Sequence, residues 1–362
     1  MSRSTVARAF LIRWRWYLCG GGAACTLLWM LYFLFVSQSY TPTVIPRPHT
    51  YTVGNSSDAS IADAPPGPPL PPAGNSTLGF EAILALSPSE SWRTMGLQAA
   101  ARLTGLTIQI PPQPPNRPEI VDAFAGLGDE GARHPNHGSA QAWVAHLDLI
   151  KHVVQSDLET ALIVEDDVDW DVSIREQMVA VADAVRQLTK TAKSDKSPYG
   201  HSWDVLWLGL CAETWEPSFE TVLIDDQTVC PADMYVGLAK APVDRLPGGQ
   251  RAVFYSGAPI CTFAYALTQE GARNVLLDVG AGKDEAFDIA LMNGCRERNL
   301  TCISVLPELF RHYIPSENFG TGSLVNSGDS DGNTEPEEEM GHTENILESA
   351  RCHALWGKPC LH

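Results

Sequence analysis

ALIVEDDVDWD, the stretch at residues 161–171, places an apolar run directly before a group of carboxylates. Its first four residues are apolar throughout and predict a buried strand. The carboxylates that follow are Glu165, Asp166, Asp167 and Asp169. Ligands of open α/β sheets bind at the carboxyl ends of strands, so this motif is expected to lie at a binding site.

Clustered carboxylates repel one another unless a positive group lies among them. A hard divalent cation, Mn²⁺ or Mg²⁺, satisfies that need with oxygen ligands and neutralises the diphosphate of a sugar nucleotide. Side chains alternate along an extended segment, which puts Glu165, Asp167 and Asp169 on one face and Asp166 on the other. Glu165 and Asp167 are therefore the expected metal ligands, with Asp169 as an alternative partner. A solvated acidic loop is the competing interpretation.

Apolar runs and helical patterns alternate on both sides of this motif. The expected strands lie at 80–87, 106–110, 161–164 and 203–209, and the expected helices reach Arg102 or span 137–158 and 268–279. Thr268 is expected to cap the last of these helices. The alternation predicts an α/β fold with a mostly parallel central sheet and helices on both faces.

The N-terminal part has the composition of a membrane anchor followed by a stem. Residues 16–36 carry no charge and are long enough to cross a bilayer. Four arginines precede this run, and no basic residue follows until Arg47, so residues 1–15 are expected in the cytosol. The chain is thus expected to be a single-pass type II protein of the Golgi or endoplasmic reticulum membrane. A cleaved signal peptide is the competing interpretation.

Residues 37–77 are rich in Pro, Ser and Thr and predict an extended luminal stem. The catalytic domain is expected over 78–328, and an acidic C-terminal segment over 329–362. No Lys or Arg lies between Asp329 and Ser349, which predicts a solvated, mobile segment. The net charge of −18 argues against a nucleic-acid partner, because binding phosphates requires clustered basic residues.

Seven cysteines follow the N-terminal apolar run, without zinc-site spacing. In an oxidising lumen some of them are expected to pair, and Cys295/Cys302 and Cys352/Cys360 are close enough in sequence to be candidates. Because seven is odd, at least one stays free or pairs between chains.

Several blocks of sequence extend this pattern. They are HGSAQAWVAHLDLIKHVV leading into the acidic motif, WDVLWLG at 203–209, CTFAYALTQEGARNVL at 261–276 and DIALMNGCRERNLTCISVLPELFRHY at 288–313. Together they resemble glycosyltransferase family 25, the lipopolysaccharide-type and collagen-type galactosyltransferases, and in particular its fungal members. The resemblance covers most of residues 80–350.

This resemblance implies a GT-A-like nucleotide-sugar transferase fold, with the acidic motif holding Mn²⁺ or Mg²⁺ under a UDP-sugar. The implied reaction moves a sugar, expected to be galactose, to a glycan or glycoprotein acceptor. Family enzymes are taken to invert the anomeric centre, which requires a general base. Asp288 is the first candidate and Asp284 and Glu285 are the next, although acidic residues favour the first turn of a helix in any case.

The resemblance also implies contacts to the nucleotide from His146, Trp143 and Asp166. His312 is a candidate nitrogen ligand that completes the metal shell. For His146 and His312 an ordinary structural role is the competing interpretation.

The chain departs from the family pattern at two places. The family's Cys-Trp-Arg is replaced by Ala142-Trp143-Val144, and its Gly-His-Cys by Gly209-Leu210-Cys211. The loss of a basic and an imidazole side chain favours the alternative of an inactive relative that binds a sugar or a partner in the lumen. A metal-dependent phosphoesterase, a third class, usually needs a second cluster of His and Asp ligands.

Overall fold

The computed structural model describes residues 71–360, except 115–116, 128–130, 132, 298, 318 and 320–334. All of these residues belong to one compact unit. The predicted anchor at 16–36 and all but the end of the predicted stem lie outside the described residues. Within the described part, none of the helices combines the length and apolarity needed to span a bilayer.

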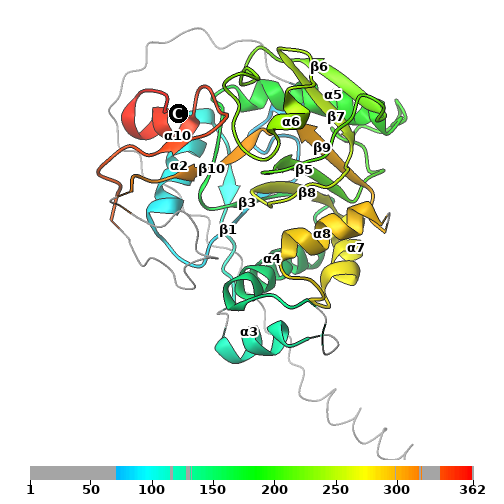
Figure 1. Ribbon diagram of the computed structural model, residues 1–362, viewed down its shortest axis with the longest axis vertical. Coiled ribbons are helices and arrows are strands. Elements are labelled where there is room, and N and C mark those ends of the chain that lie inside the picture. Colours follow the sequence, from blue (N-terminus) through cyan, green and yellow to red (C-terminus); the bar gives the residue numbers. More distant parts are fainter. Residues whose placement is uncertain are drawn as a thin grey trace, which may run out of the picture. The chain divides into compact units, whose positions relative to one another are not determined.

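A mixed sheet of eight strands forms the centre of this unit (Figure 1). Its strands are β1 (Ala82–Leu86), β2 (Ile108–Gln109), β3 (Thr160–Glu165), β5 (Val205–Gly209), β6 (Thr221–Asp225), β7 (Gln250–Tyr255), β8 (Ala264–Thr268) and β9 (Cys302–Leu306). They are hydrogen bonded in the order β2-β1-β3-β8-β5-β9-β7-β6. The α/β fold predicted from the sequence is confirmed.

The direction of the strands corrects one part of that prediction. β1 pairs in parallel with β2 and β3, and β5 with β9. β8 lies antiparallel between β3 and β5, and β7 is antiparallel to β9 and β6. The sheet is therefore mixed, because a short apolar run indicates a buried strand without indicating which way it runs.

Helices cover both faces of the sheet, as predicted. One hydrophobic core joins it to α3 (Pro118–Ala125), α4 (His137–Gln155), α7 (Gln269–Val279) and α8 (Phe287–Arg296). The other joins it to α2 (Trp92–Thr104) and α5 (Ile174–Leu188). In β3, Ile163 faces the first core and Leu162 and Val164 face the second, which explains the unbroken apolar run before the carboxylates.

The predicted N-cap of α7 is confirmed. The backbone N–H of Gly271 donates to the Thr268 hydroxyl at 2.9 Å, which satisfies one of the free donors at the start of the helix.

The ends of the compact unit differ from the predicted boundaries. A 3₁₀ turn, η1 (Pro72–Gly74), packs against α5, with Ala73 buried and Arg175 donating to the Gly74 carbonyl at 2.7 Å. The folded part therefore starts before Leu78. The prediction places residues 72–74 in the stem, because a Pro-rich composition does not show whether a short segment packs against a helix.

The acidic C-terminal segment is likewise not wholly solvated. Within it, β11 (His342–Thr343) pairs with β10 (Phe310–Ile314), which also pairs with β4 (Val168–Trp170) to form a second, antiparallel sheet. A helix, α10 (Ala350–Trp356), packs beside α2 (Figure 1). A short helix, α6 (Lys240–Val243), lies between β6 and β7 in the chain.

Both predicted disulfides, Cys295–Cys302 and Cys352–Cys360, are present. A third, Cys211–Cys261, joins residues 50 positions apart, so sequence spacing gave no sign of it. Cys230 is buried and forms no disulfide among the described residues.

We expect peptide mapping without reduction to recover these three pairs from the folded protein. Cys230 should resist alkylation until the protein unfolds, because the thiol is buried and burial raises its pKa to about 11. Mass spectrometry of native and denatured samples tests this. Labelling of Cys230 at equal rates in the two samples would contradict the structure.

Candidate functional site

The acidic motif spans the end of one strand, a turn and the start of another. Glu165 is the last residue of β3, Asp166 and Asp167 form a turn, and Asp169 lies in β4. The expectation of one extended segment with alternating faces is therefore wrong, because the chain turns after Glu165. Each carboxylate has its own set of neighbours.

Glu165 lies beside the start of β8. Its backbone N–H donates to the Phe263 carbonyl at 3.0 Å, and the Thr262 hydroxyl donates to its Oε1 at 3.3 Å. Nε2 of His146 lies 3.9 Å from the same oxygen. Burial raises the pKa of Glu165, and the charges of Asp167, Asp166 and Asp288 raise it further.

Asp166 reaches toward the end of β1. Because β1 and β3 are parallel neighbours with Leu86 opposite Glu165, Ser87 and Asp166 leave the same edge of the sheet. The Ser87 hydroxyl donates to Asp166 Oδ2 at 2.6 Å. Burial and then the charge of Asp167 raise the pKa of Asp166.

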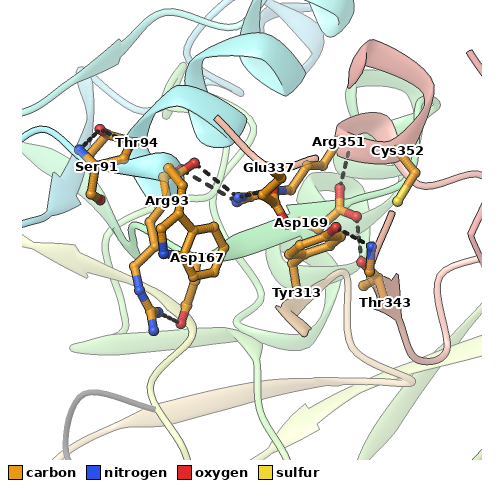
Figure 2. Close-up of polar contacts among 12 residues, drawn as sticks. Ser91, Arg93, Thr94, Asp167, Asp169, Tyr313, Glu337, Thr343, Arg351 and Cys352 are labelled. Carbon is orange, nitrogen blue, oxygen red and sulfur yellow. Dashed lines mark hydrogen bonds and ion pairs between the residues drawn. The ribbon is translucent and has the colours of Figure 1, made fainter. Parts of the chain in front are cut away.

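Asp167 forms a buried ion pair with Arg93 of α2 (Figure 2). The Arg93 Nη1 donates to Oδ2, and the side chains of Arg93 and Asp167 are only 3% and 10% exposed. Oδ1 of Asp167 is buried and has no hydrogen-bond partner among the described residues. A buried carboxylate oxygen without a donor is costly, so this atom fits a site for a cation.

His312 lies in β10, opposite Val168 of β4. The next residue, Tyr313, donates its backbone N–H to the Asp167 carbonyl at 2.8 Å. Burial lowers the pKa of His312, and the negative charge of Asp167 opposes that shift. Nδ1 of His312 is buried without a hydrogen-bond partner in the described part of the chain. The pairing of β10 with β4 thus brings the backbone of His312 beside the turn that carries Asp167.

Asp169 is turned away from this group and toward the C-terminal segment (Figure 2). Its Oδ2 accepts from the hydroxyls of Thr343, at 2.7 Å, and Ser349. Its Oδ1 accepts from the backbone N–H groups of Arg351 at 3.0 Å and Trp170 at 2.8 Å. The carboxylate thus has a structural role, and the structure does not bring it together with Glu165 and Asp167.

The three candidate bases are separated. Asp288 accepts from the backbone N–H of Cys261 at 3.0 Å and lies close enough to Glu165 to raise its pKa. Asp284 accepts instead from the Asn293 amide at 3.1 Å, and the exposed Glu285 pairs with Arg133. Asp288 is therefore the candidate that the fold places at the acidic motif.

A strained residue holds Asp288 there. Cys261 has φ of 68°, a left-handed conformation that is uncommon for a residue other than glycine. Its disulfide to Cys211 ties this segment to the chain just after β5. Backbone strain of this kind is often stored at functional sites.

His146 and Trp143 lie on the buried side of α4. His146 is hydrogen bonded to the Tyr265 hydroxyl at 3.0 Å and stacked on Phe287, and burial lowers its pKa to about 3, so the ring is neutral. His146 contacts the acidic motif through Glu165. Trp143 is fully buried and packs edge-on against Phe124 and Phe287, so the structure gives it a core position.

Protein side chains alone do not form a complete metal site in the described residues. No group of three or more His, Cys, Asp or Glu side chains there has the arrangement of a metal centre. Mg²⁺ is, however, usually bound through one or two carboxylates together with substrate phosphates. Asp167 and Glu165 fit that requirement as a pair of carboxylates, and Oδ1 of Asp167 is buried with no hydrogen-bond partner among the described residues.

Sequence reasoning missed Arg93, Ser87 and Thr262. Ser87 follows β1 directly, and Arg93 lies in the first turn of α2, the next helix along the chain. Because β1 is the parallel neighbour of β3, the residues that follow β1 lie beside the acidic motif. That signal was available only once β1 and β3 were known to pair. Thr262 reaches the motif because β8 runs antiparallel to β3.

Comparisons with known proteins do not show a family for this chain. No protein family model matches it, and no curated protein matches it significantly. A solved structure of CMP:2-keto-3-deoxy-manno-octonic acid synthetase complexed with CTP is distantly similar, with a TM-score of 0.25 and 12% identity over 62% of this chain and 88% of that one.

The carboxylates make the stability of the protein depend on pH. The pKa is about 8 for Glu165 and about 7 for Asp166, against ordinary values of 4.5 and 3.8. The folded protein therefore holds protons that the unfolded chain releases, so this stability is present below about pH 4 and is lost as the pH rises toward about 8.

We expect the melting temperature to fall over this range in EDTA, and Mn²⁺ to raise it more at about pH 8 than at about pH 5. Scanning calorimetry measures both effects. Glu165→Gln should flatten the pH dependence, whereas an Asp183→Asn variant, which changes an exposed carboxylate of α5, should not. An Mn²⁺ shift of equal size at both pH values would argue against a cation among these carboxylates.

Proposed function

We propose that this protein is a metal-dependent glycosyltransferase that moves a sugar from a UDP-sugar to a glycan or glycoprotein acceptor. The observation that carries the proposal is the buried Oδ1 of Asp167, which belongs to a group of three carboxylates at the end of β3 and receives no hydrogen bond from the described residues. The sequence blocks that resemble glycosyltransferase family 25 support the same reaction, with galactose as the proposed sugar and a GT-A-like fold.

Asp167 and Glu165 would hold Mn²⁺ or Mg²⁺, with His312 as a nitrogen ligand. When bound, the cation supplies charge to neutralise the diphosphate of the donor and of the departing UDP. Asp166 and Ser87 lie on the side of the motif that faces β1, where they would contact the nucleoside.

Asp288 is proposed as the base that accepts the proton of the acceptor hydroxyl in an inverting transfer. Its carboxylate is oriented by the backbone N–H groups of Cys261 and Ile289. Those contacts leave lone pairs on both oxygens to accept a further hydrogen bond. His146 is a less suitable base, since its two ring nitrogens already face Tyr265 and Thr262.

Disulfides are typical of proteins in an oxidising lumen. The sequence also has three N-glycosylation acceptor triplets, at Asn55-Ser56-Ser57, Asn75-Ser76-Thr77 and Asn299-Leu300-Thr301. Both features are compatible with a luminal location, and we propose the Golgi or endoplasmic reticulum membrane. The anchor would be residues 16–36, with the folded unit in the lumen.

A screen of UDP-sugars with Mn²⁺ tests the reaction directly. We expect release of UDP from one donor, UDP-galactose first, and loss of that release in EDTA. Glu165→Gln should lower the rate by roughly 100-fold or more, because a metal ion contributes several kcal/mol to stabilising the developing charge. Glu176→Gln, a change of an acidic residue in the first turn of α5, is the control and should retain activity. A protein that neither binds UDP nor releases it from any donor would contradict the enzyme and favour the inactive relative.

Asp288→Asn separates the base from the metal site. We expect transfer to an acceptor to fall by about 100-fold or more, within the usual contribution of a general base, while binding of UDP with Mn²⁺ stays unchanged. Asp284→Asn, which changes a carboxylate bound to Asn293 instead, should affect transfer much less. Calorimetry of UDP binding and a radiolabelled transfer assay measure the two quantities. Equal loss in both variants would overturn the assignment of Asp288.

A further inference from the structure

Arg93 lies where the first helix of the central α/β unit begins. It follows Ser91, the N-cap of α2, by two residues, and its guanidinium reaches across to Asp167 (Figure 2). A long helix directs the partial positive charge of its N-terminus outward, and α2 has 13 residues. The Arg93 side chain therefore brings a positive charge from the first turn of α2 to the acidic motif.

The backbone around Arg93 is held rigidly. Arg351, which is fully buried, donates to the carbonyls of Trp92 at 3.2 Å and Arg93 at 3.4 Å. It is paired in turn with Glu337 at 3.2 Å. The Trp92 ring lies against both guanidinium groups, with the Arg93 and Arg351 carbons 4.8 Å and 5.1 Å from its centroid. The Arg93 side chain can thus change partner only by rotating about its own bonds.

A divalent cation and the Arg93 guanidinium compete for the same carboxylate. Both are positive, so a cation bound to Asp167 repels a guanidinium that stays on Oδ2. A guanidinium that leaves this oxygen loses a buried ion pair, and a second anion at the same place offsets that loss. A diphosphate bound to the same cation supplies that anion, and arginine binds phosphate oxygens in a bidentate manner.

We propose that Arg93 is a diphosphate-binding residue, which pairs with Asp167 in the ligand-free protein and moves to the phosphates of a nucleoside diphosphate when the divalent cation binds. The inference rests on the proposed function, since it names a residue of the same donor site. It assigns Arg93 two roles with opposite effects on affinity. Arg93 weakens the binding of the cation alone and strengthens the binding of the nucleotide to the loaded protein.

Substitution of Arg93 therefore has a signature that loss of structure does not produce. We expect Arg93→Met to bind Mn²⁺ alone about fivefold or more tightly than the parent, and to bind UDP at saturating Mn²⁺ about fivefold or more weakly, the scale of ordinary coupling between sites. Arg93→Lys keeps the charge and loses the bidentate geometry. Its affinity for Mn²⁺ should stay close to that of the parent, while its affinity for UDP falls.

The full-length protein is used, with Mn²⁺ binding followed by electron paramagnetic resonance and UDP binding by calorimetry. Thermal melting checks that each variant is folded. If Arg93→Met does not fold, the binding of Mn²⁺ and UDP by Arg93→Lys decides the outcome. Arg251→Lys is the matched control, because Arg251 forms a comparably buried pair with Asp226 and should leave both affinities unchanged.

A parent protein that binds neither Mn²⁺ nor UDP would overturn the proposed function and the role of Arg93 with it. A parent that binds both ligands, together with Arg93 variants whose affinity for UDP is unaltered, would overturn the role of Arg93 alone. A folded Arg93→Met variant that binds Mn²⁺ more weakly would do the same.

Discussion

Repulsion among carboxylates at the end of β3 is the constraint on which the arrangement of the site depends. Four acidic side chains follow Val164 within a few residues, and all lie largely out of water. The fold separates them instead of pairing each with a base. Asp169 receives neutral and backbone donors from the C-terminal segment, Asp166 receives a hydroxyl, and Arg93 neutralises Asp167.

Glu165 forms no ion pair with an arginine or lysine of the described residues. Its neighbours are a hydroxyl and a histidine that burial keeps neutral. Burial, and then the excess of negative charge on Asp167, Asp166 and Asp288, raises the pKa of Glu165. That excess is the electrostatic condition for binding a divalent cation with an anionic nucleotide. The strand order determines which residues surround this charge. The turns after β1 and before β8 must both meet the end of β3, and the parallel pairing on one side and antiparallel pairing on the other bring them there.

Local patterns in the sequence were sufficient for the elements that flank the motif. Continuous apolar runs indicated β1, β3 and β5, and helical spacing indicated α2, α4 and α7, because each depends on residues close together in the chain. The direction of β8 and the turn at Asp166 were not predictable in this way. Both depend on pairing between distant strands, and an apolar run of five residues reads the same in either direction.

In the C-terminal segment, the charge composition was likewise insufficient to predict the structure. Its acidic composition predicted solvation, yet Glu337 is paired with the buried Arg351, and Thr343 and Ser349 bind Asp169 from more than 170 positions away in the chain. Composition counts charges and does not identify partners. The C-terminal segment therefore stabilises the acidic motif. The backbone N–H of Arg351 donates to Asp169, and the Arg351 side chain donates to the backbone carbonyl of Arg93.

The two departures from the family pattern can be weighed against these contacts. Leu210 is fully buried in the core that also contains α4, and Val144 packs against the same core from the helix side. The carboxylates, Arg93, Ser87 and Thr262 contact one another without either residue, so the changes leave the polar contacts of the motif intact. Cys211, next to Leu210, retains the disulfide to Cys261 that orients Asp288. Neither Leu210 nor Val144 supplies one of these polar contacts, so the argument for an inactive relative has to rest on other contacts, such as those that bind the acceptor.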